Sequence, residues 1–114
     1  FLPSRLDYLA SSEDVCRAGN SDDLARSCIA RALDSLRSAL HNLHHLYFPD
    51  VVVLGGGLSQ GLAPYLGEIR SWFRQLKRYD GRKNRLVLSR LGDKAGLLGA
   101  AALALSIEIA NSDE

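Results

Sequence analysis

The chain has no methionine, two cysteines and three prolines, and aromatic residues make up only 7% of its 114 positions. It also lacks an excess of either charge, because its formal net charge is +1. A balanced charge gives no reason to expect nucleic acid or a membrane surface as a partner. The chain opens on Phe1 without a start residue, and no signal-peptide pattern follows. We therefore expect it to be a piece of a longer protein.

Long hydrophobic runs and paired cysteines are also missing. The longest apolar run, residues 95–107, is shorter than the roughly 20 residues that a membrane span needs, so we expect no membrane association. Cys16 and Cys28 form neither a CxxC pair nor a zinc-ligand spacing. We expect both to be free core residues of a cytoplasmic protein. The composition, with 46% hydrophobic and 24% charged residues, is that of one globular domain.

The most informative stretch is a short apolar run that leads directly into glycines. Val51 to Leu54 are followed by Gly55, Gly56 and Gly57. The run predicts a strand buried on both faces, as in a parallel sheet. The glycines predict a sharp turn with room for something to approach, and open α/β sheets bind ligands at the carboxyl ends of their strands. A tight turn without a ligand explains these residues equally well.

Two helices are predicted before this strand. Ser12 to Asp14 begin the first, and Gly19-Asn20 end it with a left-handed cap. The second is a long amphipathic helix over about residues 21–46, with Ser21 as its N-cap and Pro49 beyond its end. Its buried stripe consists of Ile29, Leu33, Leu36, Leu40, Leu43 and Tyr47.

Another helix and a second strand are predicted after the glycines. Residues 62–79 have a helical period, and residues 86–89 read as a second short buried strand. Two strands joined by such a helix form a right-handed parallel βαβ unit. The predicted fold class is therefore α/β, a parallel βαβ unit flanked by long helices. The apolar stripe of the connecting helix consists of Leu62, Leu66, Ile69, Phe73 and Leu76.

A last helix is expected from Asp93, as its N-cap, to about Ala110. It is rich in small residues, among them Gly96 and Gly99. Because glycine within a helix costs about 1 kcal/mol relative to alanine, we expect another backbone or a ligand to pack closely against this helix.

The common phosphate-binding and catalytic motifs are not matched. A dinucleotide fingerprint from Gly55 needs glycine where Gln60 stands, and a P-loop from Gly56 needs lysine where Leu62 stands. Ser59 lacks the surroundings of a nucleophile elbow. We therefore assign no catalytic residue to this chain.

Two further groups have both a structural and a functional interpretation. His41, His44 and His45 share one helix, but a third metal ligand is missing, so we expect solvated or boundary histidines and no metal site. A basic run favours the solvated face of a helix and its loop, with a patch for phosphate or an acidic partner as the alternative. The run comprises Arg70, Arg74, Lys77, Arg78, Arg82, Lys83 and Arg85.

Four segments together resemble the C-terminal part of the ROK family of bacterial sugar kinases and repressors. They are Arg17-Ala18-Gly19-Asn20, Asn42-Leu43, residues 48–59 (FPDVVVLGGGLS) and residues 91–101 (LGDKAGLLGAA). Each segment is weak alone, but their order and separations make the resemblance specific. It covers about residues 13–106.

The resemblance implies an actin-like, ribonuclease H-like ATPase fold with two lobes and a cleft between them. Residues 1–114 would be a single partial domain, the truncated C-terminal lobe on the nucleotide side. Gly55, Gly56 and Gly57 would match the family's adenosine motif, where bare backbone lets the nucleotide lie against the chain. ATP with magnesium would be the cofactor of the intact protein, and a sugar its substrate.

The family's phosphate motif, catalytic aspartate, sugar-binding residues and zinc motif all lie upstream of the matched region. The chain alone would therefore be neither a complete kinase nor a zinc protein. Three hypotheses stay open: part of a sugar kinase, the sugar-sensing lobe of a transcriptional repressor, or a non-enzymatic dimerisation module. Nucleic acid would be a partner only of a repressor. The family's earlier strands would lie beside Val51–Leu54, so we expect the isolated chain to self-associate or to pair with the missing part.

Overall fold

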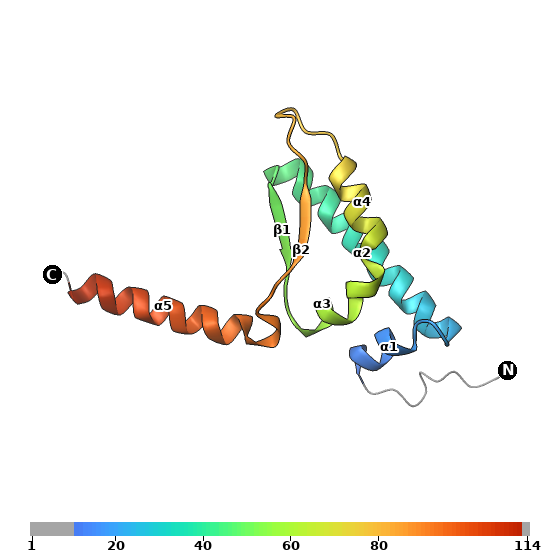
Figure 1. Ribbon diagram of the computed structural model, residues 1–114, viewed down its shortest axis with the longest axis horizontal. Helices are drawn as coiled ribbons and strands as arrows, with labels where there is room; N and C mark the ends of the chain where they lie inside the picture. Colours follow the sequence, from blue (N-terminus) through green and yellow to red (C-terminus); the bar gives the residue numbers. More distant parts are fainter. Residues whose placement is uncertain (1–10, 113–114) are drawn as a thin grey trace.

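A computed structural model describes residues 11–112. A two-stranded sheet lies at the centre, with helices packed beside it and one helix projecting from its end (Figure 1). The elements in chain order are α1 (Ser12–Ala18), α2 (Asp23–Tyr47), β1 (Val51–Leu54), α3 (Gly57–Leu62), η2 (Ala63–Tyr65), α4 (Gly67–Gln75), β2 (Arg85–Leu88), η3 (Gly92–Lys94) and α5 (Ala95–Ser112).

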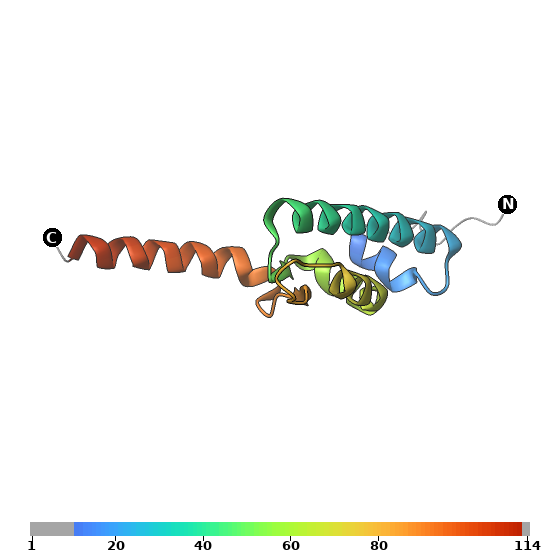
Figure 2. The same ribbon diagram turned by 90° about the horizontal axis from the view of Figure 1, so that it is seen from above.

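The two strands are parallel, as predicted, with Val51 opposite Arg85 and Leu54 opposite Leu88. Helix α2 lies across the layer formed by the strands and α4 (Figure 2). One face of the sheet packs against these helices, and the other is uncovered, since Val53 is 60% exposed. The prediction of a strand buried on both faces is therefore wrong for the described part of the chain. The core of the covered face consists of Leu40, Ile69, Phe73 and Leu86, with Val52 and Leu54 against it.

The connection between the strands contains the predicted apolar stripe but is not one continuous helix. Leu62, Leu66, Ile69 and Phe73 are buried. The helical path is broken by the 3-10 turn η2, which has Pro64 in its first positions. Helix α4 then ends at Gln75, because the side-chain amide of buried Asn84 donates to the carbonyl oxygens of Phe73 at 3.0 Å and Leu76 at 3.2 Å.

Helix α2 has nearly the predicted bounds, but a different residue caps it. The carboxylate of Asp22, rather than the hydroxyl of Ser21, accepts the N–H groups of Leu24 at 2.9 Å and Ala25 at 3.0 Å. One carboxylate oxygen thereby satisfies two free donors at the positive end of the helix. The prediction of a buried stripe is correct at Ile29 and Leu40, which are buried, and wrong at Leu43 and Tyr47, which are exposed.

Helix α1 begins as predicted, with Ser11 as its N-cap, but Gly19 is not a left-handed cap. Its φ is −57°, which any residue can adopt. Gly19 is buried where α1 meets the rest of the fold, and a Cβ there would overlap the Ile29 side chain and the Tyr65 hydroxyl. That hydroxyl donates to the carbonyl of Cys16 at 2.9 Å. This glycine is required by close packing rather than by a turn.

Helix α5 projects from the body in both ribbon views (Figures 1 and 2). It begins at Ala95, and Asp93 lies in η3 without a capping hydrogen bond, so the predicted cap is wrong. A Cβ on Gly96 or Gly99 would meet no atom of the described chain within 4 Å. The expected close neighbour is thus absent from residues 11–112. Within the same residues, no helix combines the length and apolarity needed to cross a bilayer.

Candidate functional site

The glycine turn follows the carboxyl end of β1 and is exposed over Gly55, Gly56 and Gly57. Gly56 has a φ of +86°, a conformation that a side chain disfavours. Ser59 closes the turn, because both its N–H, at 3.2 Å, and its hydroxyl, at 2.6 Å, donate to the carbonyl of Gly56. The turn therefore has a defined shape and presents bare backbone to the outside.

The turns that follow the two strands adjoin each other. The N–H of Ser89, just beyond β2, donates to the carbonyl of Leu54 at 2.7 Å. A Cβ on Gly57 would lie 3.0 Å from the Asp93 carboxylate, and one on Gly55 would lie 3.8 Å from the Cβ of Ser89. Parallel pairing thus brings two segments far apart in sequence into one surface at the carboxyl edge of the sheet, where α/β folds place ligands.

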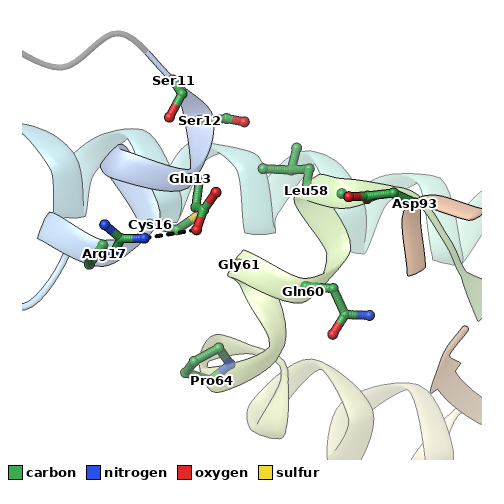
Figure 3. A pocket seen from close by; sticks show the side chains of 11 residues that line it. Ser11, Ser12, Glu13, Cys16, Arg17, Leu58, Gln60, Gly61, Pro64 and Asp93 are labelled. Carbon is green, nitrogen blue, oxygen red and sulfur yellow. Dashed lines mark hydrogen bonds and ion pairs between the residues drawn. The ribbon is translucent and has the colours of Figure 1, made fainter. Parts of the chain in front are cut away.

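A cavity of about 650 Å³ opens beside the glycine turn, between α1, α3 and η3 (Figure 3). Leu58 gives it an apolar wall and is half exposed. Glu13 and Arg17 of α1 form an ion pair at 2.8 Å on its rim. The lining residues are Ser11, Ser12, Glu13, Cys16, Arg17, Gly57, Leu58, Gln60, Gly61, Pro64 and Asp93.

Two of the residues that line this cavity, Ser11 as the N-cap of α1 and Cys16 within α1, have structural roles. Ser11 accepts the N–H of Asp14 at 3.2 Å and caps α1. Burial raises the pKa of the Cys16 thiol, which keeps it protonated and makes it a poor nucleophile.

The histidines differ from one another in their surroundings. His41 and His45 are exposed, as predicted, with ring centroids 4.2 Å apart. His44 is only 2% exposed, and its Nε2 lies 3.1 Å from the Lys77 carbonyl, so the prediction of a boundary residue is wrong. Among the described residues, no group of three His, Cys, Asp or Glu side chains is arranged to hold a metal ion.

The two cysteines have different environments. Both are free thiols, as predicted. Cys16 is buried at the α1 end of the core, whereas Cys28 is exposed on α2, so its assignment to the core is wrong. Cys28 lies outside the apolar stripe that carries Ile29. The helical period alone could therefore have predicted that Cys28 is exposed.

Arg78 joins two segments of the chain through its hydrogen bonds, although the sequence predicts it on the solvated face of a helix and its loop. Its side chain is only 4% exposed. The guanidinium donates to both carboxylate oxygens of Asp80, at 2.8 and 2.6 Å, and to Asp50 at 3.1 Å. It also donates to the carbonyl oxygens of Phe48 and Pro49, and so ties the segment before β1 to the loop before β2. Hydrogen bonding to Arg78 holds the pKa of Asp80 well below its usual range.

A family model described as the ROK family matches residues 5–107. The chain belongs to the ROK family. This confirms the resemblance carried by the four sequence segments.

Among curated proteins, this ROK chain is similar to N-acetyl-D-glucosamine kinases. Those of Escherichia coli O1:K1 / APEC and O127:H6 (strain E2348/69 / EPEC) are 34% identical to it over 103 residues, and that of O139:H28 (strain E24377A / ETEC) is 33% identical. Each alignment covers 86% of this chain and 32% of the kinase. The chain thus corresponds to about a third of the length of these relatives. No solved structure gives a significant match.

Proposed function

We propose that this chain is the nucleotide-side, C-terminal part of an ATP-dependent ROK sugar kinase. Family membership and the kinase relatives support this proposal. The observation that carries it is the exposed glycine turn at the carboxyl end of β1, where a parallel α/β sheet offers its ligand site. The parallel pair with α2 and α4 against one face agrees with part of an actin-like lobe.

In this proposal Gly55, Gly56 and Gly57 hold the adenosine part of ATP. The geometry fits, because a Cβ on Gly56 would point into space that no described atom occupies within 4 Å. Bare backbone there lets a flat ring approach, and the cavity beside Gly57 gives it room. ATP, bound with magnesium in the intact protein, supplies the phosphoryl group. The residues of this chain bind and position the nucleotide, and the catalytic groups belong to the remainder of the kinase.

The partners of the intact protein follow from the same proposal. The nucleotide and a sugar are its small-molecule partners, and N-acetyl-D-glucosamine is the sugar to test first because the relatives are named for it. The uncovered sheet face and α5 would pair with the remainder of the protein, or with a second copy when the chain is alone.

The test is an ADP-release assay on the intact protein with ATP, magnesium and N-acetyl-D-glucosamine, with other hexoses in parallel. We expect ADP release that depends on a sugar. If the intact protein instead binds operator DNA in a sugar-dependent manner and releases no ADP, it is a repressor. If it shows neither property and only self-associates, it is a dimerisation module. Either result would contradict the proposed kinase function.

A further inference from the structure

A second hollow, which shares no lining residue with the cavity beside the glycine turn, lies between α4 and β2. It has a volume of about 350 Å³. Four cationic side chains line it, and all four residues are exposed. These are Arg70 and Arg74 from α4, and Lys83 and Arg85 from the loop and strand that follow. We call this hollow the cationic groove.

The charges of the cationic groove are not neutralised locally. Asp50 and Asp80 pair with Arg78 and Arg82 rather than with the groove cations. Glu68, two positions before Arg70 on α4, forms no ion pair with a groove cation among the described residues. No acidic residue lines the groove, and none of its four cations forms an ion pair within the described residues. The cationic groove therefore concentrates positive charge on a chain whose formal net charge is only +1.

The floor of the groove is apolar. Val87, which is partly exposed, provides it, whereas Leu86 also lines the groove but is only 6% exposed and packs in the core beside Phe73. Asn84 lies in the wall, but its side-chain amide is already used by the last turn of α4. An occupant that matches both features carries negative charge at its edges and an apolar group between them.

We propose that the cationic groove binds an acidic peptide segment of a partner protein, with carboxylates at the four cations and an apolar side chain on Val87. A peptide fits better than nucleic acid, because no aromatic side chain lines the groove for base stacking and the floor is apolar. A neighbouring hollow of about 580 Å³ shares Arg74 and Lys83 and adds Lys77, so the positive surface can follow a longer segment.

Lys83 and Asn84 precede β2 and Arg85 begins it, whereas the glycine turn follows the carboxyl end of β1. Peptide binding at the cationic groove therefore does not depend on nucleotide binding at the glycine turn, and either activity can be absent without the other.

The test measures binding of a short fluorescent peptide of alternating glutamate and leucine to the 114-residue chain by fluorescence anisotropy. Two matched peptides replace glutamate with glutamine or leucine with serine. We expect both replacements to weaken binding about tenfold or more, because one removes the charge and the other the apolar contact. Equal binding of all three peptides would overturn the proposal.

The protein variants use a matched pair. Arg74→Glu lies in the groove, and Arg31→Glu makes the same charge change on exposed α2. We expect Arg74→Glu to weaken binding about tenfold, Arg31→Glu to leave it nearly unchanged, and a lysine-containing peptide to recover affinity for Arg74→Glu. Circular dichroism checks that both variants fold. Equal effects of the two substitutions, or tighter binding of duplex DNA or inorganic phosphate than of the acidic peptide, would contradict the peptide assignment.

Discussion

Single glycines meet two different needs in this chain. Gly56 lies at a positive φ in an exposed turn, where backbone conformation decides the residue. Gly19 has an ordinary helical φ, and its missing Cβ lets Ile29 and Tyr65 come close. The first need is local and could be predicted from the run of glycines after an apolar strand. The second depends on residues 10 and 46 positions away, so no local pattern indicates it.

At Gly19 we expect substitution to damage packing rather than backbone conformation. Gly19→Ala should lower the free energy of unfolding by about 1–3 kcal/mol, the usual cost of overpacking a core. Gly67→Ala is the control, because it adds the same methyl group at the start of α4 where no described atom lies within 4 Å. It should be neutral or stabilising by up to about 1 kcal/mol. Urea denaturation measures both, and equal effects would contradict the packing role.

Asp80 gives a prediction for acid stability. Its pKa is lowered in the folded chain, so the unfolded chain binds more protons at this carboxyl in acid. The stabilisation by the Arg78–Asp80 pair is therefore complete above the ordinary carboxyl pKa of about 4 and is lost as pH falls below it. Asp80→Asn should lower the melting temperature at pH 7 and reduce its fall in acid, whereas exposed Asp34→Asn should do neither. Parallel melting curves for wild type and Asp80→Asn at every pH would contradict this.

Among the elements, helical periods and the bounds of α2 were predictable, whereas the break and the end of the helix between the strands were not. The stripe from Leu62 to Phe73 is buried because apolar residues at spacings of three and four share one face. The same spacing continues through Pro64 and beyond Gln75, where the helix is broken or ends. The end of α4 depends on Asn84, which reaches back from the next loop, and such a contact has no signature in the helix itself.

Helix α4 is the element that joins the sheet to α2, and Phe73 is its fully buried contact. Phe73→Ala should lower the free energy of unfolding by about 3–5 kcal/mol, since it removes a large side chain and leaves a cavity. Leu46→Ala, at a position 72% exposed on α2, should have little effect. Chemical denaturation distinguishes the two, and a loss below about 1 kcal/mol for Phe73→Ala would show that α4 is not docked as described.

For the whole molecule, the main feature is surface that the described chain leaves uncovered. The radius of gyration is 18.5 Å, compared with about 13 Å for a compact domain of 100 residues. Helix α5 projects from the body and exposes Leu97, Leu103 and Leu105. Its small and apolar composition predicted that it needs a neighbour. Composition does not say which surface provides that neighbour, so the projecting position could not be predicted.

We expect the isolated chain to self-associate through these uncovered surfaces. Sedimentation equilibrium should show dimers or larger species that dissociate on dilution. Leu97→Asn should weaken the association, and Leu46→Asn should not, although the two leucines are 73% and 72% exposed. A clean monomer whose Val51–Leu54 amides are all protected from hydrogen exchange would contradict this expectation.

The central claim, that the glycine turn holds a nucleotide, is tested most directly at Gly57. Gly56 is less suitable, because its positive φ would strain any substitution. A methyl group on Gly57 meets only the flexible Asp93 side chain, so Gly57→Ala should fold normally. ATP titration of the intact protein by calorimetry should show binding weakened about tenfold in Gly57→Ala, or about 1.4 kcal/mol, and unchanged in Gly67→Ala. Unchanged ATP binding in Gly57→Ala, or equal loss of binding and folding, would contradict the account.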